Sequence, residues 1–193
     1  MGIDLTKGER INLSKSNPGL KRVRVGLGWS ANQFDTGGSY DLDASVFVCE
    51  AGPKLISDKH FIFYNNHADP EGAVKHAGDN RTGDAEGDDE TVIIDLAKLH
   101  ANAEEISFIV TIHGAPENGQ NFGQVSNSYI KLYDDETGVE IAKYSLEDEA
   151  SGATAVQFGS VYKKDGQWSF KAVGQGFKKG LGDFVGIYGG TAA

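Results

Sequence analysis

The chain has 193 residues and a formal net charge of −10, with 28 Asp and Glu against 18 Lys and Arg. This length fits a single domain, and an apolar fraction of 39% is enough for a hydrophobic core. The charge argues against a nucleic-acid-binding protein, because phosphate contacts need clustered Lys and Arg, and the sequence has no basic stripe. A chain with this charge is better suited to binding cations.

Cysteine content and the N-terminal segment indicate the cellular setting. Cys49 is the single cysteine, so the sequence offers neither a disulfide framework nor a thiolate-rich metal site. The first residues, MGIDLTKGERINL, contain no long apolar run, and the longest apolar runs fall far short of a membrane span. We therefore expect a cytoplasmic protein that is not inserted in the membrane.

Alternation of apolar and polar residues recurs along the chain, and this period of two is typical of half-buried β-strands. In RVRVGLGW, for example, Val23, Val25 and Leu27 share one face. HFIFYN is apolar on both faces, which predicts a central strand. In chain order, the predicted strands are 11–14, 22–29, 43–49, 60–65, 90–96, 105–113, 128–134, 139–145, 156–163 and 167–172.

The connections between these strands favour an all-β fold. Turn sequences such as Thr137-Gly138 and Asp165-Gly166 stand directly before predicted strands. A helical pattern is confined to DLAKLHANAEE (95–105), and no alternation of strands with helices is present. About ten short strands with hairpin spacing predict an antiparallel two-sheet β-sandwich with one or two short helical segments. We expect residues 1–193 to form one such domain.

The most unusual stretch is GDNRTGDAEGDDE (78–90), which contains six acidic residues and one Arg and so carries half of the net charge. Such charge blocks are usually solvated loops. Here, however, glycines separate the acids and let the backbone turn carbonyl groups inward, as a cation site requires. The acidic residues are Asp79, Asp84, Glu86, Asp88, Asp89 and Glu90.

A second acidic feature, SYDLDASVF (39–47), places Asp41 and Asp43 on one side of an extended strand. Two neighbouring carboxylates repel each other unless something neutralises them. All the candidate ligands in both stretches are oxygen donors, which suits Ca²⁺ because that ion takes about six to eight oxygens in flexible geometry. The carboxylates exceed the need of one ion, so we expect about two Ca²⁺.

Other chemistries find little support in the sequence. An EF-hand starting at Asp79 would put Arg81 at its third position, and no G-x-S-x-G motif occurs. Cys49 lies in a predicted buried strand, where a thiol is inert. The histidines have no zinc-motif spacing, and each is expected to be a surface or strand residue rather than a zinc ligand: His60, His67, His76, His100 and His113. We therefore expect no catalytic residues and no enzymatic activity.

Several stretches, in the same order and over nearly the whole chain from about Leu5 to Tyr188, resemble the TerD family of tellurium-resistance proteins. They are VGLGWS (25–30), YDLDASVF (40–47), SDKHFIFYNN (57–66), GDNRTGDAEGDDE (78–90), NFGQVSNSYIKLYD (121–134), EIAKYSL (140–146) and WSFKAVGQGF (168–177). The resemblance implies a two-sheet β-sandwich that binds Ca²⁺ and belongs to bacterial tellurite-resistance and stress-response systems. The family's acidic motifs fall on Asp41, Asp43 and the acids of 78–90. Ser30 and Tyr40 depart from the family pattern, where Asp and Phe are usual.

These observations lead to one hypothesis and two alternatives. The hypothesis is a Ca²⁺-dependent interaction module, in which Ca²⁺ orders the 78–90 segment against Asp41 and Asp43 and creates a surface for a partner. The expected partners are other tellurite-resistance proteins, at the inner face of the membrane, and not nucleic acids. The first alternative is a metal-independent acidic scaffold that docks to a partner. The second is an enzyme or direct scavenger acting on tellurite.

Overall fold

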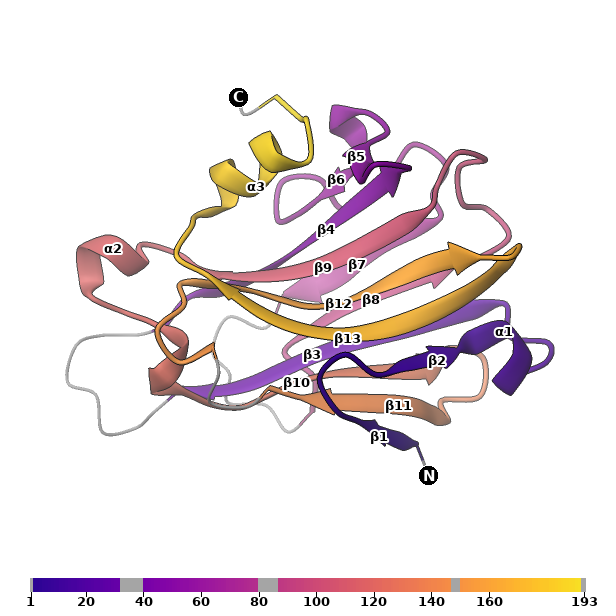
Figure 1. The fold of residues 1–193 in the computed structure, drawn as a ribbon, viewed down its shortest axis with the longest axis horizontal. Helices are drawn as coiled ribbons and strands as arrows, with labels where there is room; N and C mark the ends of the chain where they lie inside the picture. The colour runs from indigo at the N-terminus through magenta and orange to yellow at the C-terminus, as the bar shows by residue number, and fades with distance from the viewer. Residues whose placement is uncertain (1, 32–39, 80–86, 147–149, 192–193) are drawn as a thin grey trace.

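The computed structural model describes residues 2–31, 40–79, 87–146 and 150–191, which form two β-sheets (Figure 1). The strands of the first sheet are ordered β1-β11-β10-β3-β8-β7, and those of the second β2-β13-β12-β9-β4-β5, with β6 paired to β4. All of these strand pairs are antiparallel except β1 with β11. This arrangement confirms the predicted all-β sandwich.

The bounds of the elements are as follows. The first sheet contains β1 (Ile3–Leu5), β3 (Arg22–Ala31), β7 (Val74–Asp79), β8 (Glu90–Asp95), β10 (Val125–Asp134) and β11 (Glu140–Ser145). The second contains β2 (Arg10–Asn12), β4 (Leu42–Glu50), β5 (Lys54–Leu55), β6 (Phe61–Ile62), β9 (Glu105–Ile112), β12 (Ala155–Lys164) and β13 (Gln167–Phe177). The helical elements are α1 (Leu13–Ser16), η1 (Asp58–His60), α2 (Ala115–Asn118), η2 (Phe122–Gln124) and α3 (Leu181–Ile187).

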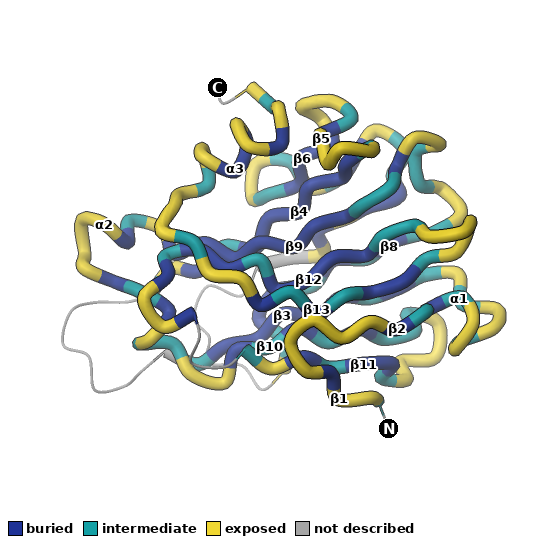
Figure 2. The backbone as a smooth tube through the Cα atoms, viewed as in Figure 1, coloured by how far each residue is buried: buried dark blue, intermediate teal, exposed yellow. Residues whose placement is uncertain are grey.

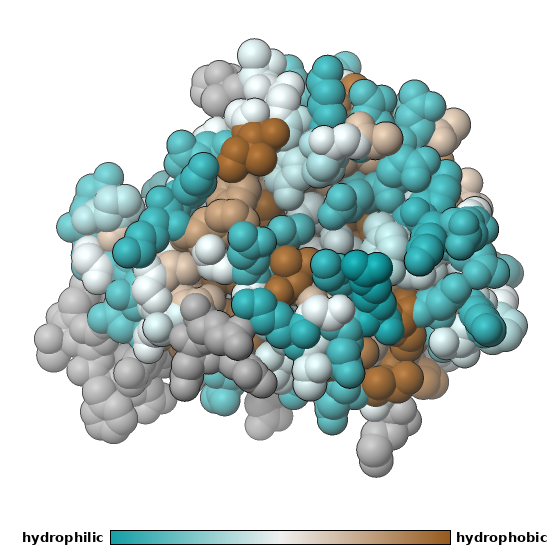
Figure 3. Space-filling view, in the orientation of Figure 1, coloured by the Kyte–Doolittle hydropathy of each residue, from teal (hydrophilic) through white to brown (hydrophobic). Residues whose placement is uncertain are grey.

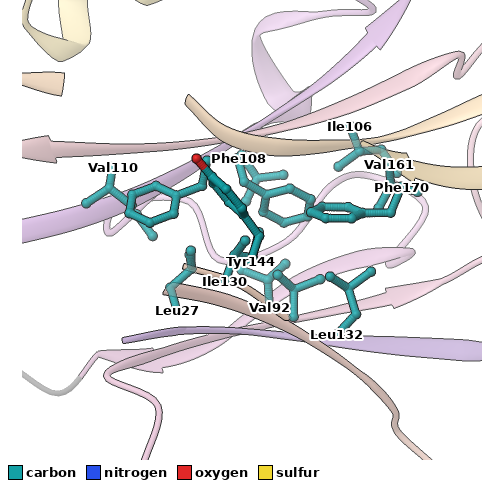
Figure 4. Close-up of a cluster of buried hydrophobic side chains, with 14 of the residues drawn as sticks. Leu27, Val92, Ile106, Phe108, Val110, Ile130, Leu132, Tyr144, Val161 and Phe170 are labelled. Atoms are coloured by element: carbon teal, nitrogen blue, oxygen red, sulfur yellow. The ribbon is translucent and has the colours of Figure 1, made fainter. Parts of the chain in front are cut away.

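The inward-facing side chains of the two sheets meet in one hydrophobic core. Leu27 and Ile130 from the first sheet lie across from Phe108 and Phe170 of the second, and all four are fully buried (Figure 4). Figure 2 shows that burial is concentrated along the middle of the long strands. Each such side chain stabilises the fold by about 1.5–3 kcal/mol. The alternating pattern of the sequence is therefore the main determinant of the sandwich.

A smaller hydrophobic cluster covers the outer face of the second sheet. Phe47 and Cys49 of β4 point to this face and pack against Phe184 and Tyr188 of the C-terminal segment. The hydroxyl groups of Tyr188 and Ser107 are hydrogen bonded at 3.1 Å. Helix α3 thus explains why the sequence of β4 is apolar on both faces: one face meets the other sheet and the other face meets this helix.

Two sequence predictions of local structure are wrong. The segment 60–65 is not a central strand, because β6 contains two residues and the backbones of Phe63 and Asn66 then bond to each other in both directions at 3.0 and 3.1 Å. The segment 95–105 is not helical, because the Asp95 carboxylate accepts the N–H of Ala97 at 3.1 Å and holds a turn. In both cases a short polar side chain or a tight turn overrides the hydrophobic pattern.

The face of the molecule that Figure 3 shows is largely polar. In Figure 3, hydrophobic side chains are interspersed among hydrophilic ones on the face that is shown. Large exposed hydrophobic residues in the described part of the chain include Ile3, Val139 and Ile187. Scattered exposed residues of this kind are usual on folded proteins. None of the described helices has the length and apolar character required to cross a bilayer.

Candidate metal centre

The structure describes the last residues of the acidic motif, 87–90, and they lie where three strands of the first sheet meet. Glu90 opens β8, and its backbone is in register with Leu27 of β3 on one side and with Asp79 of β7 on the other. Asp88 and Asp89 immediately precede it. The predictions for Asp84 and Glu86 fall outside the described residues, and Asp79 is described for its backbone alone.

Asp88 lies on the outer face of the first sheet. Its Oδ1 accepts a hydrogen bond from the Tyr129 hydroxyl at 2.8 Å, and the same hydroxyl is 3.2 Å from the Gly87 carbonyl oxygen. Burial, reinforced by the contact with Asp88, raises the pKa of Tyr129, so the phenol keeps its proton and remains a donor. Tyr129 therefore fixes the direction of the Asp88 carboxylate.

Two glycines of the VGLGW sequence make room for this pair. A Cβ atom at Gly26 would lie 2.0 Å from Oδ2 of Asp88, and one at Gly28 would lie 2.3 Å from Cζ of Tyr129. Neither distance is compatible with a side chain. The polar face of β3 is therefore glycine-rich because the carboxylate and the tyrosine ring lie directly on its backbone.

Asp89 is 4% exposed and is held by the backbone of β3. Its Oδ2 accepts the N–H of Trp29 at 2.8 Å, and its own N–H donates to the Leu27 carbonyl at 2.8 Å. Burial raises the pKa of Asp89, the hydrogen bond from Trp29 opposes that rise, and the neighbouring charge of Asp88 adds to it. Two adjacent carboxylates are thus fixed in place although they repel each other.

Glu90 points into the sandwich, as its alternation with buried Val92 and Ile94 requires. Its Oε2 pairs with Nε2 of buried His76 on β7. Its Oε1 accepts the N–H of Ala44, on β4 of the other sheet, at 3.4 Å. Glu90 therefore connects the two acidic stretches, because the residue that donates to it, Ala44, directly follows Asp43.

Asp41 and Asp43 are close to this junction but face the other way. Leu42 and Ala44 belong to the central core, so strand alternation directs the two carboxylates to the opposite face of the second sheet. Asp41 is exposed and Asp43 is half-buried. The described residues contain no group of three acidic ligands from the two predicted stretches with all ligand atoms within 4.8 Å of one another.

That distance criterion is met elsewhere, by His60, Asp69 and Glu71. This group was not predicted from the sequence, in which His60 is expected to be a surface or strand residue rather than a zinc ligand. The three residues follow no metal-binding spacing, and they meet only because the chain turns back after β6. A structure was needed to find them.

The fold and the carboxylate junction together define a β-sandwich protein with a fixed acidic centre at one end of the sandwich. Residues 1–188 match the TerD domain, and the chain belongs to the TerD family. This confirms the resemblance seen in the sequence.

Named relatives agree with this assignment. The chain is 45% identical over 193 residues to the tellurium resistance protein TerD of Serratia marcescens, covering 100% of both chains. It is 46% identical over 189 residues to general stress protein 16U of Bacillus subtilis (strain 168), covering 98% of both chains. A crystal structure of a homologue of the telluride resistance protein TerD from Streptomyces coelicolor A3(2) has a TM-score of 0.69 at 24% identity, covering 86% of this chain and 95% of that chain, which supports the fold.

Proposed function

We propose that this protein is a Ca²⁺-binding interaction module of a bacterial tellurium-resistance and stress-response system. One observation carries the proposal: Asp88 and Asp89 are adjacent carboxylates, each held by a hydrogen bond, and the charge of Asp88 disfavours ionisation of Asp89. A divalent cation would remove that repulsion. Preorganised oxygen donors of this kind suit Ca²⁺ better than Mg²⁺, which demands a tighter octahedron and retains its waters.

The residues have different roles in this proposal. Asp88 and Asp89 bind the ion directly, and Asp79, Asp84 and Glu86 complete the ligand set. Glu90 positions them, because its carboxylate is already engaged by His76 and Ala44 inside the sandwich. Asp41 and Asp43, on the opposite face of β4, contribute to a second ion, which retains the expected total of about two.

The proposed role of Ca²⁺ at this junction is electrostatic. Its binding would neutralise part of the acidic centre and change the surface that the protein presents to a partner. We propose that the partners are other tellurite-resistance proteins at the inner face of the membrane, and that the protein acts in the cytoplasm as a binder rather than an enzyme. The family names of the relatives support the resistance and stress context.

Calorimetric titration with Ca²⁺ tests the proposal directly. We expect about two Ca²⁺ per chain, weaker binding of Mg²⁺, and loss of at least one site in the double variant Asp88→Asn with Asp89→Asn. The matched control is Asp4→Asn with Asp165→Asn, since both of these acids are exposed and lie outside the acidic stretches. Absence of Ca²⁺ binding, or equal binding of Mg²⁺, would contradict the proposal. Salt-sensitive partner binding that persists in chelator would instead support the metal-independent scaffold.

A further inference from the structure

A separate group of potential metal ligands lies on the segments on either side of β6, which is labelled in the upper part of Figure 1. His60 ends η1, and Asp69 and Glu71 belong to the loop between β6 and β7. All three residues precede Val74, the first residue of β7, whereas the acidic motif begins at the last two residues of that strand. The strand between them has six residues and a length of about 17 Å, which separates this group from the described acids of the motif, Asp88, Asp89 and Glu90.

Asp69 has an oxygen atom that the described fold leaves unsatisfied. The residue is 4% exposed, and its Oδ1 accepts the N–H groups of Ala73 at 2.7 Å and Val74 at 3.0 Å. Its Oδ2 is buried, and none of the described residues forms a hydrogen bond with it. Burying a carboxylate oxygen without a partner is destabilising. A cation bound by Asp69, His60 and Glu71 would satisfy this atom.

His60 is prepared to act as a ligand. It is 3% exposed, its Nδ1 lies 2.7 Å from the Ser57 hydroxyl, and its Nε2 lies 2.9 Å from Oε2 of Glu71. On metal binding, Nε2 would exchange its contact with Glu71 for the ion, while the Nδ1–H of the imidazole donates to the Ser57 hydroxyl. Ser57 thus orients the imidazole in the way that outer hydrogen-bond partners usually orient metal-bound histidines.

We propose that His60, Asp69 and Glu71 bind a divalent transition-metal ion, with Zn²⁺ as the representative. An imidazole nitrogen combined with two carboxylates suits zinc and its neighbours, whereas Ca²⁺ and Mg²⁺ select oxygen donors alone. The ligand atoms lie within 4.8 Å of one another, so modest side-chain movement brings them around one ion.

His100 lies beside this group but is not one of the three residues whose ligand atoms lie within 4.8 Å of one another, so its ring would have to move toward the ion to become a fourth ligand. Its ring centroid is 5.5 Å from that of His60, in an edge-to-face arrangement. Its Nδ1 accepts the N–H of Asn102 at 3.0 Å, which leaves Nε2 as the coordinating nitrogen. With His100, the set would contain two histidines, one aspartate and one glutamate, all of them residue types that bind zinc.

Titration of the full chain with Zn²⁺, in the presence of excess Ca²⁺, tests the proposal. We expect one Zn²⁺ per chain, with affinity reduced at least about tenfold in Asp69→Asn and in Glu71→Gln. Asn at 69 retains the oxygen that accepts from Ala73 and Val74, so this variant keeps the loop. Glu71 is only half-buried, which makes the second variant a safe check on folding. Co²⁺ should give the visible absorption bands of a tetrahedral site, and both variants should weaken them.

The matched control is His113→Gln with Glu117→Gln, an exposed histidine and glutamate near α2. Its zinc affinity should equal that of the unmodified protein. Three results would overturn the proposal: no Zn²⁺ binding, wild-type affinity in both site variants, or displacement of Zn²⁺ by Ca²⁺. The last result would mean that Zn²⁺ occupies the acidic centre, and it leaves the proposed Ca²⁺ function untouched.

Discussion

The carboxylate of Glu90 joins the two sheets, because it accepts the backbone N–H of Ala44 at 3.4 Å while its other oxygen pairs with His76. Glu90 stands at the start of β8 and Ala44 near the start of β4, so the contact lies at the end of the sandwich where both acidic stretches are found. A single buried side chain therefore couples the stability of the fold to the geometry of the candidate metal centre.

Glu90→Ala should lower the free energy of unfolding by about 3 kcal/mol, because it leaves His76 and the N–H of Ala44 without this buried partner. Urea denaturation in chelator measures the change in the absence of metal. Glu117→Ala, on exposed α2, is the control and should change stability by less than about 0.5 kcal/mol. A loss below about 1 kcal/mol for Glu90→Ala would show that the contact does not hold the sheets together.

The sandwich was predictable because its long strands carry simple alternation. Val23, Val25 and Leu27 are all fully buried, as their pattern requires. The strands that the sequence analysis missed, such as β1, β5 and β7, are short or contain a histidine or glycine in place of an apolar residue. His76 is the clearest case, since it is buried by its pairing with Glu90 and not by hydrophobicity. Such partners are distant in sequence, so no local pattern reveals them.

Gly26→Ala should weaken Ca²⁺ binding about tenfold without unfolding the protein. The added Cβ would lie 2.0 Å from Oδ2 of Asp88, so the carboxylate must leave its position against Tyr129. Calcium titration, accompanied by a thermal melt, separates loss of affinity from loss of fold. Gly152→Ala is the matched control, because a Cβ there has no neighbour within 4 Å. Unchanged affinity in Gly26→Ala would remove Asp88 from the ligand set.

The candidate ligands were only partly predictable. Composition pointed to Asp88 and Asp89, and the structure adds that Tyr129 and Trp29 hold them. Composition did not distinguish Glu90 from its neighbours, although it faces the interior. The inward direction of Glu90 follows from strand alternation, and the apolar residues Val92 and Ile94, which come after Glu90 in β8, indicate it in the sequence. Prediction of shared ligands requires distances between strands, and a single sequence does not contain them.

Cys49 should not react with thiol reagents in the folded protein. It is fully buried under α3, and burial, with a smaller effect of Glu105, raises the pKa of its thiol to about 12. We expect no reaction with a disulfide reagent at neutral pH, and complete reaction once the protein is unfolded in denaturant. Rapid labelling of the native protein would reopen the alternative in which the protein acts directly on tellurite.

Tyr188 should make the protein less stable as the solution becomes alkaline. Burial raises the pKa of Tyr188 to about 12, against the hydrogen bond with Ser107, and the pKa of Cys49 is raised to the same range. Below about pH 7.5 both groups are protonated in the folded and the unfolded state, because the unfolded thiol titrates at about pH 8.5 and the unfolded phenol at about pH 10, so their contribution to stability is complete there. From about pH 8.5 for Cys49 and about pH 10 for Tyr188, up to about pH 12, the unfolded chain loses these protons while the folded chain keeps them, and the unfolding free energy falls by up to about 1.4 kcal/mol per pH unit for each group.

Urea denaturation at a series of pH values from neutral to strongly alkaline measures this slope. Tyr188→Phe removes one of the two groups, so its stability should fall less steeply between about pH 10 and 12, whatever its stability at neutral pH. Tyr64→Phe is the control, because Tyr64 is 49% exposed and its substitution should leave the slope as it is. Parallel curves for Tyr188→Phe and the unmodified protein would show that Tyr188 titrates normally, and that α3 does not seal the outer face of β4.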